Sequence, residues 1–168
     1  CLIERGWSLN DRYYSERLLR KLAPILEGVG AFDSHIKTPR VTDYVGVHRQ
    51  VSFQEGTGPN GRGAIVSEFH ITDPRLQRLA RVAPHLIKLS INGKGSVRHG
   101  IAEGREGLIV EDVDDSARWS CDPVVNAGAR GGIGAVLEAF DEGENMDVTS
   151  LSDLKKAFPS LLEEFRSE

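Results

Sequence analysis

Short stretches of alternating hydrophobic and polar residues recur along most of the chain. Alternation with a period of two is typical of a half-buried strand, whereas apolar residues spaced three or four apart are typical of a helix. The alternating stretches predict strands at residues 31–32, 44–53, 64–71, 85–92, 97–102, 108–113 and 119–125. In the second of these, the alternation falls out of phase near Arg49, which predicts a break in the strand register.

Apolar residues at helical spacing predict two helices, one before the first of these strands and one between the third and the fourth. Ser15 is placed to cap a helix that ends near Leu26, because a serine side chain can accept from the free N–H groups of the first turn. Thr72 or Asp73 is placed to cap a second helix, with Pro74 in its first turn. Both helices are expected to bury one apolar face.

The end of the chain differs in composition from the rest. Residues 133–140 have the pattern of a helix, 141–147 form an acidic linker, and the residues beyond resemble a final capped helix. We therefore divide the chain into one domain at 1–140 and a tail at 141–168, which holds the acidic linker and a C-terminal helical segment.

The order of these elements indicates the fold class. Short strands dominate residues 40–125, with helices inserted among them and appended after them. That order predicts an α+β fold and favours a small mixed β-barrel over a doubly wound parallel sheet. The 168 residues, 39% of them hydrophobic, are enough for one domain with a real core.

Composition argues against several classes of function. A formal net charge of −4 is a poor basis for binding nucleic acid or an anionic membrane, and no apolar run approaches the roughly 18 residues of a membrane span. Cys1 and Cys121 lack a CxxC spacing, and the histidines form no HExxH pair. We expect no disulfide framework, no metal and no cofactor, and a reducing, cytoplasmic setting.

One serine stands out as a candidate nucleophile. Ser90 lies within the apolar frame Leu-Ile-Lys-Leu-Ser-Ile, where alternation places it on the face opposite Leu89 and Ile91. A strand fixes the direction of a hydroxyl, which favours a precise catalytic geometry. The alternative is a strand serine that only bonds a neighbouring carbonyl. The GxSxG motif is absent, so the nucleophile elbow of the α/β-hydrolases does not apply.

A serine nucleophile needs a base, for which the chain offers five histidines. They are His35, His48, His70, His85 and His99. His35 differs from the others because it ends a short apolar strand and precedes a Thr-Pro loop, and loops commonly carry functional residues. A histidine at a strand end is also commonly structural, so both interpretations stay open at this point.

Two further features could complete a site. Asp122 is enclosed by apolar residues, and a carboxylate in such surroundings needs a hydrogen-bond partner such as an imidazole N–H or a salt bridge. The stretch Gly-Ala-Arg-Gly-Gly at 128–132 could present backbone N–H groups and one guanidinium to an anion. It lacks the GxxxxGK[ST] pattern of phosphate-binding loops, so a nucleotide-binding site is only weakly indicated.

Several longer stretches carry a further signal in their order and spacing. They are GWSLNDRYYSERLLRKLAPILEGVGAFDSH, DYVGVHRQV, LIKLSINGKG, WSCDPVVNAGARGG and DLKKAFPSLLEEF. Together they resemble the prohead (capsid maturation) proteases of tailed bacteriophages, a family related in fold to the herpesvirus assemblins. The resemblance covers most of residues 5–165 and implies a small, closed, mostly antiparallel β-barrel flanked by helices.

The same resemblance implies a set of catalytic residues. LIKLSINGKG resembles the nucleophile strand of the family, which makes Ser90 the nucleophile, and the end of the first stretch makes His35 the general base. Asp122 is the best candidate for the third member of the triad, where it would orient the imidazole and stabilise its charged form. Arg130 and the Gly131 N–H fall where assemblins carry an oxyanion loop, which implies a role in oxyanion stabilisation.

The chain departs from the family pattern beside these residues. Lys88 stands where the family commonly has Gly, two residues before the serine, and Ser120 stands where some relatives place Glu or His. The acidic stretch after residue 110 therefore supplies reserve candidates for the third triad member, namely Glu111, Asp112 and Asp114.

The resemblance thus implies a serine endopeptidase that cleaves scaffold protein and major capsid protein, and its own tail, during prohead maturation. It places the chain in the host cytoplasm, inside the assembling prohead, and allows a homo-oligomer. The alternative is a non-catalytic capsid-assembly or scaffolding module in which Ser90 and His35 only pack. A third interpretation is an anion- or nucleotide-binding domain that uses residues 128–132.

Overall fold

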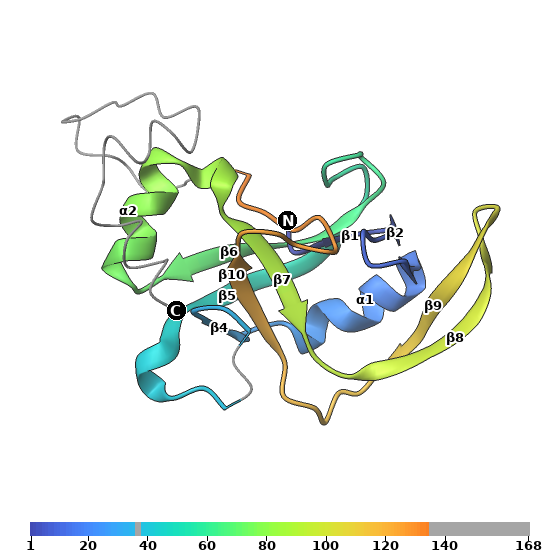
Figure 1. Cartoon of the computed structure of the whole chain (residues 1–168), viewed down its shortest axis with the longest axis horizontal. Helices are drawn as coiled ribbons and strands as arrows, with labels where there is room; N and C mark the ends of the chain where they lie inside the picture. Colours follow the sequence, from blue (N-terminus) through green and yellow to red (C-terminus); the bar gives the residue numbers. More distant parts are fainter. Residues whose placement is uncertain (36–37, 135–168) are drawn as a thin grey trace.

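A computed structural model of the chain describes residues 1–35 and 38–134 (Figure 1). Strands predominate, and two α-helices lie between them in the sequence. In chain order the elements are β1 (Ile3–Glu4), β2 (Gly6–Trp7), β3 (Arg12–Tyr14), α1 (Glu16–Ile25), β4 (Gly30–Phe32), β5 (Tyr44–Gln54), β6 (Ala64–Ile71), α2 (Pro74–Val82), β7 (Lys88–Asn92), β8 (Gly95–Ala102), β9 (Arg105–Val113) and β10 (Ser120–Val124).

The strands form three sheets. Four strands pair in the order β1-β6-β5-β4, four in the order β2-β3-β9-β8, and β7 pairs with β10 alone. All pairs are antiparallel except β3 with β9. β8 and β9 form a long hairpin that extends away from the rest of the molecule, at the opposite end from α2 (Figure 1). The expected α+β class with mostly antiparallel strands is confirmed.

The expectation of a closed barrel is wrong for the described residues. One sheet curves into a half-barrel, and no continuous backbone ladder closes it. Side chains make the junction of β10 with β4 and β5: the Phe32 N–H donates to the Asp122 carboxylate at 3.0 Å, and His48 Nε2 donates to the Cys121 carbonyl at 3.0 Å. A closed barrel requires strand-to-strand hydrogen bonds all the way round.

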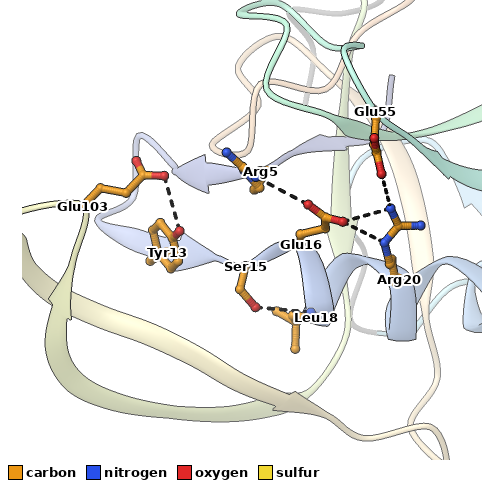
Figure 2. A network of polar contacts seen from close by, with 8 residues as sticks. All are labelled: Arg5, Tyr13, Ser15, Glu16, Leu18, Arg20, Glu55 and Glu103. Carbon is orange, nitrogen blue, oxygen red and sulfur yellow. Dashed lines mark hydrogen bonds and ion pairs between the residues drawn. The ribbon is translucent and has the colours of Figure 1, made fainter.

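The first helix is fixed at its N-terminus, as predicted. Ser15 is the N-cap, and its Oγ accepts from the Leu18 N–H at 3.2 Å. Glu16 accepts from Arg5 and Arg20, and Arg20 also contacts Glu55 at 2.6 Å (Figure 2). The pairs of Arg20 are exposed, and the pair of Arg5 with Glu16 is partly buried. Ion pairs this close to the surface contribute little energy alone. Together they connect α1 to the N-terminal strands and to the β5–β6 turn.

The main core lies between α1 and the sheets. Its buried apolar residues include Leu2, Ile3, Leu18, Leu19, Leu22, Leu26, Ile65, Leu89, Val110 and Cys121. Two of them, Leu89 and Cys121, directly adjoin candidate site residues in β7 and β10. Because side chains alternate along a strand, the burial of Leu89 directs Ser90 toward the opposite face.

Some predicted features occur at the expected residues, and one predicted strand begins later than expected. The register of β5 shifts between Arg49 and Ser52, as expected, and Asp73 rather than Thr72 caps α2. The strand predicted at 85–92 begins only at Lys88, because the residues before it form a short 3-10 helix, Pro84–Leu86.

The predicted C-terminal elements fall mostly beyond the described residues. Residues 133 and 134 are not helical. The remainder of the predicted helix at 135–140, and the whole tail at 141–168, lie outside the described residues. Neither α1 nor α2, the helices of the described part, is long and apolar enough to cross a membrane.

Candidate active site

Ser90, His35 and Asp122 meet at one point of the structure. Nε2 of His35 lies 3.0 Å from Oγ of Ser90, and Nδ1 of the same ring lies 2.7 Å from Oδ2 of Asp122. The three residues come from β7, the segment after β4, and β10, and 55 and 87 positions separate His35 from its two partners. Such a hydroxyl–imidazole–carboxylate chain is the arrangement of a serine-hydrolase triad.

The pairing register of β7 and β10 fixes the positions of two of the three side chains. Ser90 is paired directly with Asp122 in this antiparallel ladder. Directly opposed residues project to the same face with Cβ atoms about 5 Å apart. Leu89 and Cys121, the neighbours that precede them, are buried in the core on the other side. The strand pair therefore presents a hydroxyl and a carboxylate together, with room for one ring between them.

The third side chain is placed by the end of β4. Phe32 is the last residue of β4, and its N–H donates to Oδ1 of Asp122 at 3.0 Å. Ser34 then adopts a left-handed backbone conformation with φ +70°, which turns the chain immediately before His35. The carboxylate that binds the imidazole thus also holds the strand that carries it.

Asp122 is almost completely buried, with 1% of its surface exposed. Three donors compensate for the loss of water: the Phe32 N–H, the Ser120 hydroxyl at 2.9 Å and Nδ1–H of His35. A proton on Nδ1 that is donated to Asp122 leaves Nε2 free to accept from the Ser90 hydroxyl. This is the tautomer that a general base at Ser90 requires.

Ser90 and His35 open into a cleft of about 870 Å³. One wall is the segment that follows β10, and it includes Arg130 and Gly131. The side chain of His35 is 40% exposed, so the imidazole is accessible from this cleft. A cleft of this volume accommodates several residues of an extended polypeptide.

Gly131 passes very close to the strand that carries the serine. A Cβ at this position would lie 2.1 Å from the Leu89 carbonyl oxygen and 2.5 Å from that of Leu2, so only glycine fits. Its own N–H donates no hydrogen bond to another described residue. Arg130 adopts φ +62°, an uncommon conformation for a residue with a side chain, and lines the same cleft. Both predicted oxyanion residues therefore line the cleft into which Ser90 opens.

The other four histidines lie away from this cleft. His48 is fully buried: Nε2–H donates to the Cys121 carbonyl, Nδ1 accepts from the Ser67 hydroxyl at 3.0 Å, and the ring stacks on Phe69. Burial lowers its pKa to about 4, so it packs as a neutral ring. The remaining three lie on the β6 surface, in the short 3-10 helix and on β8: His70, His85 and His99.

The reserve carboxylates are engaged elsewhere. Glu111 binds Arg98, Asp112 binds Lys21, and Asp114 binds Ser116. All three carboxylates are exposed, on or just after β9, and none of them lines the cleft of Ser90. Asp122 is therefore the carboxylate that the structure places beside the imidazole.

Ser120 is a site residue that the sequence did not single out as a contributor. It is buried, and its hydroxyl donates to the same Asp122 oxygen that binds His35. Its position in the sequence could have indicated this role. Ser120 precedes Asp122 by two residues in a strand, so both side chains lie on one face. Within the described residues, no cluster of three or more His, Cys, Asp or Glu side chains is arranged to hold a metal.

Searches against protein-family models, curated proteins and solved structures found no match for this chain.

Proposed function

We propose that this chain is a serine endopeptidase that uses Ser90, His35 and Asp122 as its catalytic triad. The observation that carries the proposal is the unbroken chain of hydrogen bonds from the Ser90 hydroxyl through His35 to buried Asp122. Each residue was a candidate on sequence grounds, and three distant segments bring them to hydrogen-bonding distances of 3.0 and 2.7 Å, the first of which is the path of proton transfer from Ser90 to His35.

The first half-reaction follows from this geometry. As Ser90 Oγ attacks the carbonyl carbon of the scissile peptide bond, its proton passes to Nε2 of His35. Asp122 stabilises the imidazolium that forms. The negative charge on the former carbonyl oxygen is balanced by the Gly131 N–H and by Arg130. His35 then gives its proton to the departing amine, which leaves an acyl ester on Ser90.

The second half-reaction uses the same groups. Water attacks the ester carbonyl while Nε2 of His35 takes one of its protons. Collapse of the intermediate returns that proton to Ser90 Oγ and releases the carboxylate product. The cycle consumes one water molecule and needs no cofactor.

The burial of Asp122 favours catalysis over a purely packing role. A buried carboxylate is costly to desolvate, and a purely packing role would need only its bonds to the Phe32 N–H and the Ser120 hydroxyl. Here it is kept with three donors, and its imidazole partner is directed at a hydroxyl beside an open cleft. A non-catalytic assembly module gives no reason for that alignment.

The biological setting is proposed from the resemblance to prohead proteases. On that basis the substrates are scaffold protein and major capsid protein, inside an assembling prohead, and the half-barrel is an open relative of the assemblin barrel. The ordered motifs from residue 5 to residue 165 support this part of the proposal.

The experiment is a cleavage assay with matched variants. The full chain, Ser90→Ala and Ser96→Ala are each incubated with candidate scaffold and major capsid proteins of tailed bacteriophages, and intact masses are followed over time. Ser96 is an exposed strand serine and serves as the control. We expect fragments from the parent chain and Ser96→Ala only. Identical patterns from all three, or no fragments from any, would favour the scaffolding alternative.

A further inference from the structure

The cleft of Ser90 carries cationic side chains without carboxylates to balance them. Lys88 and Arg130 line it together with His35, and among the described residues no Asp or Glu contributes to its wall. The chain as a whole is acidic, with a formal net charge of −4. Against that overall balance, a cleft whose charged side chains are cationic attracts anionic groups.

Lys88 is held at the edge of this cleft by the strand that carries the nucleophile. It precedes Ser90 by two residues in β7, so both side chains project to the same face while buried Leu89 lies between them. Its aliphatic stem passes the glycine loop, since a Cβ placed on Gly132 would lie 3.7 Å from Lys88 Cδ. Lys88 itself is exposed.

The ammonium of Lys88 and the guanidinium of Arg130 form no ion pair with other described residues. Most arginines near the N-terminal strands are different, because Arg5, Arg62 and Arg105 each bind a carboxylate. Unpaired cations beside a nucleophile can form an ion pair with an anionic substrate directly, because no ion pair within the protein has to break first.

We propose that Lys88, supported by Arg130, makes this site select polypeptides that carry Asp or Glu close to the scissile bond. This inference rests on the proposed peptidase function. Lys88 lies about 7 Å along the strand from Ser90, which is two residues of extended chain. The preferred acidic residue is therefore expected within two positions of the cleaved bond. Lys88 acts as a specificity-determining residue and takes no part in the proton transfers.

The test compares specificity among matched variants of the full chain. The parent, Lys88→Gln, Lys88→Glu, Lys88→Arg and Lys21→Gln are incubated with a peptide library made from denatured cellular proteins, and new termini are sequenced by mass spectrometry. Ser90→Ala supplies the background. Lys21 is an exposed lysine on α1, outside the cleft, and is the control. We expect Asp and Glu to be enriched beside the bonds cut by the parent, Lys88→Arg and Lys21→Gln.

A peptide pair that differs only by Glu or Gln at the enriched position then gives the magnitude. We expect the parent to favour the Glu peptide about fivefold in kcat/KM at low salt, the size of an exposed ion pair. The ratio should fall toward one in Lys88→Gln and invert in Lys88→Glu. Binding of the same peptides to Ser90→Ala, measured by fluorescence anisotropy, should show the same preference without turnover.

The outcomes separate the two claims. Cleavage that depends on Ser90 but shows no acidic preference, or a preference that Lys88→Gln retains in full, would overturn the role of Lys88 and leave the peptidase intact. Absence of any cleavage that depends on Ser90, with equal binding of both peptides to Ser90→Ala, would overturn both.

Discussion

Ser90 on β7 is paired directly with Asp122 on β10, and the imidazole of His35 bridges their side chains. The strand register therefore fixes the separation of nucleophile and carboxylate independently of the position of His35. His35 is held in turn because Asp122 also binds the Phe32 N–H at the end of β4. One buried carboxylate thus organises both the base and the strand that delivers it.

Replacement of Asp122 by Asn should abolish most activity while the fold is kept. The amide has nearly the same volume, but it cannot stabilise the imidazolium, and its NH₂ favours the wrong tautomer of His35. We expect kcat/KM to fall by about 10³- to 10⁴-fold. Peptide hydrolysis, with circular dichroism as the check on folding, measures this. A loss smaller than tenfold would mean that Asp122 is a structural residue.

Ser120 should behave as a positioning residue, because its hydroxyl donates to the Asp122 oxygen that also binds His35. Ser120→Ala leaves that oxygen with one donor fewer, so we expect kcat to fall about tenfold with KM unchanged. Ser120→Thr keeps the hydroxyl and should restore most of the rate. The exposed Ser96→Ala is the control. An equal change in KM and kcat, or no rescue by Thr, would contradict this role.

Gly131 should tolerate no side chain. A Cβ there would lie 2.1 Å from the Leu89 carbonyl oxygen, so Gly131→Ala must displace the loop from β7. We expect a loss of about 1–3 kcal/mol in the free energy of unfolding and a fall in kcat of at least tenfold. Gly134→Ala is the matched control, since nothing lies within 4 Å of its Cβ position. Equal behaviour of the two variants would rule out close packing at Gly131.

The buried ring of His48 should make the fold sensitive to acid. Its pKa is about 4 in the native state against 6.5 when unfolded, so between these values only the unfolded chain binds the proton. The free energy of unfolding should therefore fall as the pH falls from 6.5 to 4, by roughly 3 kcal/mol from this group. Urea titrations at several pH values measure the slope.

His48→Gln provides the comparison for that measurement. The glutamine amide can still donate to the Cys121 carbonyl, but it does not titrate. We expect the variant to lose less stability than the parent over the same pH interval. Parallel curves for the two proteins would show that His48 is not the group responsible.

Local signals in the sequence predicted much of the fold. The caps at Ser15 and Asp73 and the alternation of β5 and β6 are encoded within a few residues, so they can be recognised from short windows. The closed barrel was predicted wrongly because closure depends on how sheets meet. At that junction, side chains of Asp122 and His48 replace a backbone ladder, which no local pattern reveals.

The site was predictable residue by residue but not as an assembly. The apolar surroundings of Ser90 and Asp122 marked each as unusual, and the resemblance to prohead proteases joined them with His35. No spacing along the chain could show that β7 and β10 pair in the register that opposes Ser90 to Asp122. Ser120 was missed as a contributor for the same reason, since its partner became evident only in three dimensions.

The measurement that tests the central claim most directly is labelling of the folded chain with a fluorophosphonate, followed by peptide mapping. A serine hydroxyl reacts with this reagent only when a base activates it. We predict one modified site, at Ser90, with labelling lost in His35→Ala and retained in Ser96→Ala. An unlabelled parent chain, or labelling of Ser90 that persists at the same rate in His35→Ala, would contradict the account.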